Sequence, residues 1–132
     1  MKRYPYTLLT ALAICIASII PVPEVPLKQV PFYDKWVHFL MYGTLSLIAW
    51  VEGRRHSAPG AERSVAVVAI VVPVAFGGLM ELAQAYLTTS RSGDWLDFAA
   101  NATGVLLAAL LVGLYHLVCR PKRKPIGPEQ QT

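Results

Sequence analysis

The sequence predicts an all-α membrane protein, a compact bundle of four transmembrane helices. Hydrophobic residues make up 55% of the 132 positions, and most of them lie in four long runs. Runs of this length match a hydrocarbon layer of about 30 Å better than the core of a soluble domain. The few polar residues within these runs fall near one predicted membrane face. These observations predict that three of the helices share one polar site.

One domain, residues 1–120, should contain all four helices. At roughly 1.5 Å per residue the last two runs easily cross the bilayer, whereas the first two are near the lower limit. Trp36 and Trp50 can occupy the aromatic belts at the two ends of the second helix. Residues 121–132 are basic and interrupted by proline, so we expect a disordered cytoplasmic tail. The predicted helices are about 4–20, 33–51, 64–87 and 98–119.

The first run has two interpretations. Lys2 and Arg3 followed by Thr7–Ile20 resemble a secretory signal, which would be cleaved. No convincing small-x-small cleavage site follows, because the chain continues as Ile19-Ile20-Pro21. A transmembrane helix is the favoured interpretation, and the orientation of the other three helices is the same in both.

The second helix follows an extended, proline-rich outer segment, residues 21–31, and a glycine- and proline-containing inner loop, residues 52–63, should separate it from the third. Pro73 and the pair Gly77-Gly78 predict a kink and close packing in the third helix. In the fourth helix, Ala100, Gly104 and Ala108 form a small-xxx-small stripe, which is typical of tight helix packing in lipid.

Positive charges predict the orientation of the bundle. With the N-terminus inside, nine basic residues lie on the cytoplasmic side and three outside, so both termini should be cytoplasmic and the polar site should face outward. The net charge of +4 is then a topology signal and gives no reason to expect nucleic acid as a partner. The inner set is Lys2, Arg3, Arg54, Arg55, Arg63, Arg120, Lys122, Arg123 and Lys124, and the outer set is Lys28, Lys35 and Arg91.

Each of the three polar segments places its polar residues three or four positions apart, and therefore on one helix face. A charge near a helix centre costs roughly 2.5–3.5 kcal/mol in a membrane, so these faces should turn inward and meet. The predicted outward pocket consists of Asp34, Lys35, His38, Tyr42, Glu81, Gln84, Arg91, Asp94, Asp97 and Asn101.

Several of these residues have simpler interpretations. Asp34 and Asp94 can be helix N-caps, and Asp94 with Asp97 resembles a capping box. Tyr42 can contribute to packing alone, and Asn101 can form a hydrogen bond between helices. Glu81 fits a structural role least well, because it lies below the membrane interface and is too short to reach water. We expect Arg91, His38 or Lys35 to be its partner.

The chemistry of the pocket is open on the sequence alone. His38, Glu81 and Asp97 are the candidates for acid–base catalysis, and Arg91 would suit a phosphate group. No His-Glu-x-x-His spacing or Cys/His zinc pattern is present, so we expect no metal and no cofactor. The sequence does not decide whether the protein is an enzyme.

Two parts of the chain match a known pattern. The run Asp34–Tyr42 (DKWVHFLMY) resembles the signature that opens the second helix of VanZ-like membrane proteins. Glu81-Leu82-Ala83-Gln84 and then Arg91, Asp94, Asp97, Asn101 and Gly104 are similar to the rest of that family's pattern in order and spacing. The resemblance covers about residues 34–104. It implies a multi-pass protein of the bacterial cytoplasmic membrane, from a family whose founding member is associated with resistance to teicoplanin.

Four functions therefore stay open. The favoured one is a VanZ-like protein of the cell envelope, whose outward pocket engages membrane lipids or a lipid-linked or cell-wall-related ligand and can contribute to antibiotic resistance. The first alternative is an outer-leaflet acid–base or metal-dependent enzyme. A small proton- or cation-coupled transporter is the second, although the inner halves of the helices, residues 66–72 and 106–112, are apolar. The last is a purely structural polar cluster.

Overall fold

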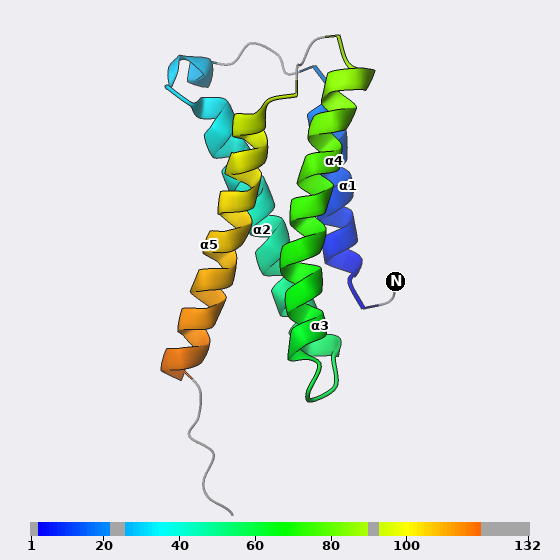
Figure 1. Cartoon of the computed structure of the whole chain (residues 1–132), viewed down its shortest axis with the longest axis vertical. Coiled ribbons are helices and arrows are strands. Elements are labelled where there is room, and N and C mark those ends of the chain that lie inside the picture. The colour runs from blue at the N-terminus through cyan, green and yellow to red at the C-terminus, as the bar shows by residue number, and fades with distance from the viewer. Residues whose placement is uncertain (1–2, 22–25, 90–92, 120–132) are drawn as a thin grey trace, which may run out of the picture.

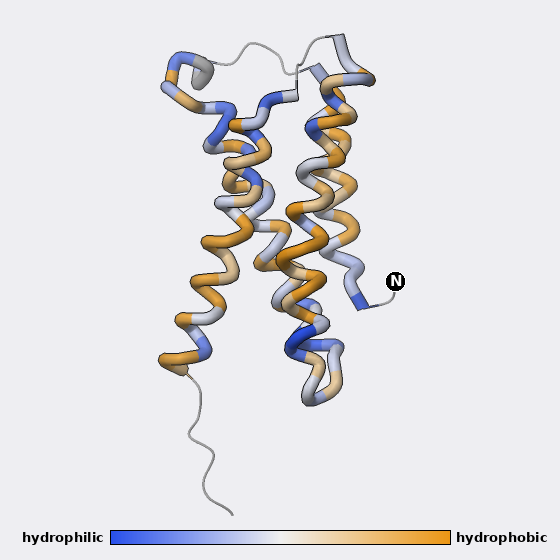
Figure 2. The backbone as a smooth tube through the Cα atoms, viewed as in Figure 1, coloured by the Kyte–Doolittle hydropathy of each residue, from blue (hydrophilic) through white to orange (hydrophobic). Residues whose placement is uncertain are grey.

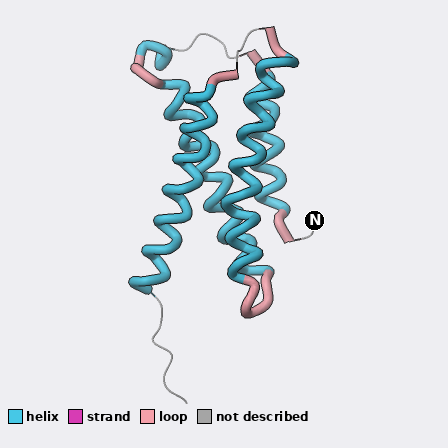
Figure 3. The backbone as a smooth tube through the Cα atoms, in the orientation of Figure 1, coloured by secondary structure: helices cyan, strands magenta, loops and turns pink. Residues whose placement is uncertain are grey.

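The computed structural model describes residues 3–21, 26–89 and 93–119, and this part of the chain is helical with no strand (Figure 3). The all-α prediction is confirmed. The elements are α1 (Pro5–Ile19), a short 3-10 turn (Pro26–Gln29), α2 (Tyr33–His56), α3 (Glu62–Ala66), a π-helical turn (Val67–Val71), α4 (Val72–Leu87) and α5 (Trp95–Cys119).

Four long rods make up the bundle, because α3, the π-helical turn and α4 join into one helix of 26 residues, Glu62–Leu87. The rods alternate in direction (Figure 1). α2 packs most extensively against α5 and also contacts α1, α3 and α4. At one end of the bundle α2 and α5 begin and α1 and α4 finish. We call this the polar end, and the other, where α1 begins and α5 finishes, the opposite end.

Two rods, Glu62–Leu87 and Trp95–Cys119, are long and apolar enough to cross a membrane. Both are hydrophobic over most of their length, with polar residues near the polar end and at the start of α3 (Figure 2). α1 has 15 residues, and at about 1.5 Å per residue it is shorter than a 30 Å hydrocarbon layer. α2 has 24 residues but carries charges near both of its ends. Membrane-spanning character is thus supported for two of the four predicted spans.

The helix bounds differ from the predicted ones because of individual side chains. α2 continues to His56, five residues beyond its predicted end at 51, and it takes in Glu52 from the segment predicted as a solvated loop. Glu52 is buried and bound to α1, which accounts for the extra helical turn. α5 begins at Trp95 instead of 98, because the side chain of Asp94 accepts a hydrogen bond from the second helical residue.

The carboxylate of Glu52 caps the N-terminus of α1. The backbone N–H of Tyr6 donates to Oε1 (2.8 Å), and the backbone N–H and hydroxyl of Thr7 both donate to Oε2 (2.7 and 2.6 Å). The first N–H groups of a helix lack partners within it, and negative charge is favoured there. At the far end of α1, Gln84 donates from Nε2 to the carbonyl of Ser18 (3.1 Å). α1 is therefore held at both ends by the other helices.

Glycine allows α2 and α5 to touch at their crossing. A Cβ on Gly104 would overlap the carbonyl oxygen of Phe39, and a Cβ on Gly43 would lie 3.2 Å from the carbonyl oxygen of Gly104. Gly104 and Ala108 of the predicted small-residue stripe are buried, and Ala100 is partly buried. The stripe thus sets the spacing of the two helices that supply most of the polar residues.

Pro73 interrupts the backbone hydrogen bonding of the third rod, and a side chain of α2 compensates for it. Proline has no N–H, so the carbonyl of Ala69, four residues earlier, loses its regular helical donor. The hydroxyl of Ser46 on α2 donates to this carbonyl (2.6 Å), and the π-helical turn lies just before the proline. Trp50 was expected in an aromatic belt, but it is buried with Ala69 in the core between α2 and the third rod.

Candidate functional site

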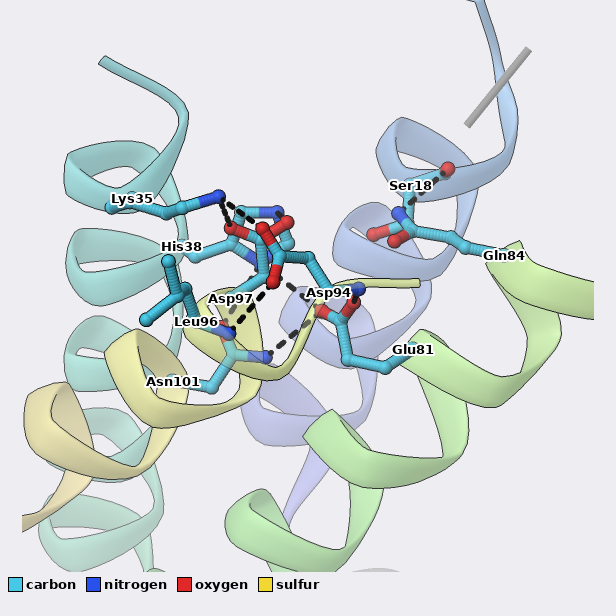
Figure 4. Close-up of polar contacts among 9 residues, drawn as sticks. All are labelled: Ser18, Lys35, His38, Glu81, Gln84, Asp94, Leu96, Asp97 and Asn101. Atoms are coloured by element: carbon cyan, nitrogen blue, oxygen red, sulfur yellow. Dashed lines mark hydrogen bonds and ion pairs between the residues drawn. The ribbon is translucent and has the colours of Figure 1, made fainter. Parts of the chain in front are cut away.

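Six side chains from α2, α4, α5 and the residue before α5 meet at the polar end (Figure 4). His38, Glu81, Asp97 and Asn101 are buried, and Lys35 and Asp94 are partly exposed above them. All six come from the ten pocket residues predicted from the sequence. We call this group the polar cluster: Lys35, His38, Glu81, Asp94, Asp97 and Asn101.

Lys35 links α2 to the start of α5. Its Nζ lies 2.9 Å from Oδ2 of Asp94 and 2.6 Å from Oδ1 of Asp97. The contact with Asp97 is close but poorly aligned for a hydrogen bond, since Oδ1 of Asp97 has no hydrogen-bond partner among the described residues. Lys35 was a predicted partner of Glu81, and the structure pairs it with these two aspartates instead.

His38 lies between an amide and a carboxylate. Its Nδ1 is 3.0 Å from Oδ1 of Asn101, and its Nε2 is 4.0 Å from Oδ2 of Asp97. Because the amide nitrogen of Asn101 is directed at Glu81, the Asn101 oxygen can accept a hydrogen bond from Nδ1–H of His38. In the neutral ring this leaves Nε2 as an unprotonated nitrogen that faces Asp97. The 4.0 Å between Nε2 and Oδ2 of Asp97 is too long for a hydrogen bond, so the ring faces this carboxylate without bonding to it.

Glu81 connects α4 to both neighbouring elements. Its Oε2 accepts a hydrogen bond from the backbone N–H of Asp94 (3.2 Å), and its Oε1 lies 3.4 Å from the amide nitrogen of Asn101 and 3.6 Å from Nδ1 of His38. The contact with His38 agrees with the prediction. All three distances exceed those of a strong charge-assisted hydrogen bond. Glu81 is thus buried with loose pairing.

Asp94 is an N-cap, as predicted, but the predicted capping box with Asp97 is not formed. Its Oδ1 accepts from the N–H of Leu96 (3.0 Å). Asp97 does not return to the Asp94 N–H, which donates to Glu81 instead. The Leu96 N–H, and then the ammonium of Lys35, lower the pKa of Asp94 below its ordinary value. One carboxylate therefore both starts α5 and joins the cluster.

Four predicted pocket residues are not in the cluster. Tyr42 is buried a turn deeper, packed against Ile14, Leu45 and Val105, and its hydroxyl has no hydrogen-bond partner in the described ranges. Gln84 turns away to bind α1. Asp34 is exposed and does not cap α2, because the helix begins at Tyr33, before it. Arg91 lies outside the described residues.

Three side chains could converge on a metal ion, contrary to the expectation from sequence spacing. Potential ligand atoms of Asp34, His38 and Asp97 all lie within 4.8 Å of one another. A His and two carboxylates suit zinc or a harder divalent metal. The ammonium of Lys35 at 2.6 Å from Asp97 already supplies positive charge there. A metal would therefore have to displace Lys35 from that carboxylate.

Sequence reasoning missed Glu52 as a buried charged residue. It was assigned to the inner loop, residues 52–63, because Gly53, Pro59 and Gly60 predict a solvated turn there. The available signal was its place one residue after the apolar run that ends at Val51. At such a position a carboxylate can accept hydrogen bonds from the N-terminus of a neighbouring helix. The partner, the start of α1, could not be read from local sequence.

Comparison with known proteins adds one relative. An uncharacterized protein of the fission yeast Schizosaccharomyces pombe, C11E3.10, is 38% identical over 93 residues, which cover 69% of this chain and 53% of that protein. The chain thus spans about half the length of this relative. No family model matches the chain. No solved structure matches it either.

Proposed function

We propose that this chain is a VanZ-like protein with four transmembrane helices, whose polar cluster faces outward and binds the polar part of a lipid-linked envelope molecule. Both termini are cytoplasmic in this proposal, and the membrane is the bacterial cytoplasmic membrane. The observation that carries it is a buried group of titratable side chains from three elements, in which His38 lies 3.6 Å from Glu81 and 4.0 Å from Asp97.

The loose pairing supports binding over a purely structural role. Buried charges are destabilising unless partners compensate for the loss of water. In the cluster, His38 lies 3.6 Å from Glu81 and 4.0 Å from Asp97, and the amide nitrogen of Asn101 lies 3.4 Å from Glu81, whereas Asp97 has a close partner in Lys35. A ligand that donates hydrogen bonds or carries positive charge would complete these groups. The long contacts of His38 and Glu81 therefore support a binding role for the cluster.

The distribution of basic residues supports the orientation. Arg54 and Arg55 lie in the last turn of α2 and Arg63 in α3, all at the end of the bundle away from the cluster (Figure 1). Loops rich in Lys and Arg stay in the cytoplasm. The polar cluster is then on the outer side, where a cell-wall precursor or another envelope lipid is accessible.

The test is the teicoplanin susceptibility of a bacterial host that expresses the wild type, Glu81→Gln or His38→Ala at matched membrane levels. Protection by the wild type and its loss in both variants is the expected result. Glu62→Gln, which changes an exposed carboxylate in α3, is the matched control and should protect fully. Full protection by both cluster variants would overturn the binding role, and no protection by the wild type would overturn the envelope-resistance function.

A second candidate function is acid–base catalysis on an outer-leaflet substrate, favoured by the geometry of His38. A base held by a hydrogen bond at Nδ1 and free at Nε2 can take a proton from a hydroxyl or water. Asp97 lies where it can stabilise the resulting imidazolium, 4.0 Å from Nε2. Asn101→Ala, which removes the group that orients the ring, should then lower turnover without abolishing binding. Unchanged turnover in His38→Gln excludes this mechanism.

A further inference from the structure

A cleft lies between α4 and α5 directly beside the polar cluster. It has a volume of about 660 Å³ and is partly open. Its walls are largely apolar side chains, among them Leu79, Leu82 and Phe98. Ala75 and Gly78 leave space on α4, where larger residues would close the gap. A hydrocarbon chain fits such a wall in both shape and chemistry.

The cleft is polar at one end only. Its charged lining residues are Glu81 and Asp94, both members of the polar cluster. From Ala75 to Glu81 the α4 wall runs for about 9 Å at 1.5 Å per residue, without another charged group. Hence the cleft suits an amphiphile whose chain lies along α4 and whose head group reaches the two carboxylates.

Charge identifies the head group. The polar cluster and the adjoining Asp34 contain four carboxylates, those of Asp34, Glu81, Asp94 and Asp97, but one ammonium, that of Lys35. Both lining carboxylates are acceptors, and the long contacts of Glu81 leave it able to accept a further hydrogen bond. A head group that is cationic and donates N–H bonds is complementary to this surface.

We propose that the α4–α5 cleft binds the acyl chain of an aminophospholipid, with its primary ammonium held by Glu81 and Asp94. This inference rests on the membrane placement in the proposed function and names a lipid class for the same site. Phosphatidylcholine, which has a positive charge but no N–H donor, binds more weakly. Phosphatidylglycerol, which has a negative head group, is repelled by the carboxylates.

Trp95 lines the cleft and reports on its occupancy. A protein with Trp36→Phe and Trp50→Phe retains Trp95 as its single tryptophan. It is placed in vesicles that contain a small fraction of lipid with brominated acyl chains, which quench indole fluorescence on contact. The brominated lipid is phosphatidylethanolamine, phosphatidylcholine or phosphatidylglycerol, at the same mole fraction. One charge-assisted hydrogen bond predicts a binding constant about tenfold higher for the ethanolamine lipid than for the choline lipid.

Two variants locate the binding. Ala75→Phe fills the apolar end of the cleft and leaves the polar cluster untouched, so it should reduce quenching by the ethanolamine lipid. The matched control is Val71→Phe, on an exposed position outside the cleft, and it should have no effect. Glu81→Gln removes the charge at the polar end, and the preference for ethanolamine over choline should then fall.

Equal quenching by all three lipids would overturn the proposal, because the tryptophan would then report only ordinary surrounding lipid. An unchanged preference in both Ala75→Phe and Glu81→Gln would overturn it as well. The measurement needs no envelope activity. If the protein prefers the ethanolamine lipid but gives no protection against teicoplanin, this inference stands and the resistance function is wrong. If it protects but all three lipids quench equally, the resistance function stands and this inference is wrong.

Discussion

The two ends of the bundle each bury one glutamate, and they satisfy it in different ways. Glu52, at the opposite end, is 4% exposed and receives three hydrogen bonds of 2.6–2.8 Å from the start of α1. Glu81, at the polar end, is 8% exposed, and its contacts range from 3.2 to 3.6 Å. Nearly equal burial therefore accompanies unequal pairing.

The difference separates a structural charge from a candidate functional one. A carboxylate at a helix N-terminus completes groups that have no other partner, so its burial stabilises the fold. A carboxylate among long contacts keeps hydrogen-bonding capacity and contributes little stability. We expect substitutions at Glu52 to act on folding and substitutions at Glu81 to act on binding.

The largest effect is expected for Glu52→Ala. The change leaves the N–H groups of Tyr6 and Thr7 without their acceptor, and hydrogen bonds to a charged group contribute about 1.5–3 kcal/mol each. We expect the free energy of unfolding in detergent to fall by roughly 3 kcal/mol, with looser attachment of α1. Unfolding followed by circular dichroism measures it, and Glu62→Ala, at an exposed position, is the control. Equal stability of the two variants would contradict the structural role of Glu52.

The helix crossing beneath the polar end provides the next largest effect. Gly104→Ala places a methyl group against the carbonyl of Phe39, so α2 and α5 must separate. Overpacking of this kind costs about 2 kcal/mol. Gly113→Ala, on the same helix with open space around it, should be neutral or slightly stabilising because alanine favours helix. Thermal unfolding of the pair compares them, and equal melting temperatures would show that the crossing is not tight.

Glu81→Gln should have little effect on stability and should strongly weaken binding. Glutamine keeps an oxygen that can accept from the Asp94 N–H, and it removes a buried charge, so the free energy of unfolding should stay within about 1 kcal/mol of the wild type. Protection against teicoplanin should nevertheless be lost. A stability loss as large as that of Glu52→Ala would remove the distinction between the two ends and favour a structural cluster.

Sequence periodicity predicted the helices and the meeting of three polar faces, because spacing by three and four determines a helix face. It could not predict that Gln84 faces α1, since the stripe on α4 is broad enough to contact two neighbours. Periodicity also could not predict the partners of Lys35, because they depend on how far its side chain extends from α2 toward α5. Glu52 was missed for the same reason, as its partner lies 45 residues away in sequence.

The smallest effect concerns Asp94, which has one structural and one electrostatic role. Asparagine is as good an N-cap as aspartate, so Asp94→Asn keeps the bond from Leu96 and removes only the ion pair with Lys35. The pKa of Asp94 is lowered in the folded protein, so its stabilising charge is present above the ordinary carboxyl value of 3.8 and is lost as the pH falls through the folded pKa.

Wild type and Asp94→Asn should therefore differ slightly in melting temperature at pH 7 and converge as the pH is lowered below the ordinary carboxyl range. Salt should reduce the difference at pH 7, since this pair is partly exposed to solvent. A gap that persists at low pH would mean that asparagine fails as a cap, and that Asp94 belongs with Glu52 as a structural carboxylate. If the two melting temperatures converge at low pH, the charge of Asp94 acts through its ion pair with Lys35, which also contacts Asp97.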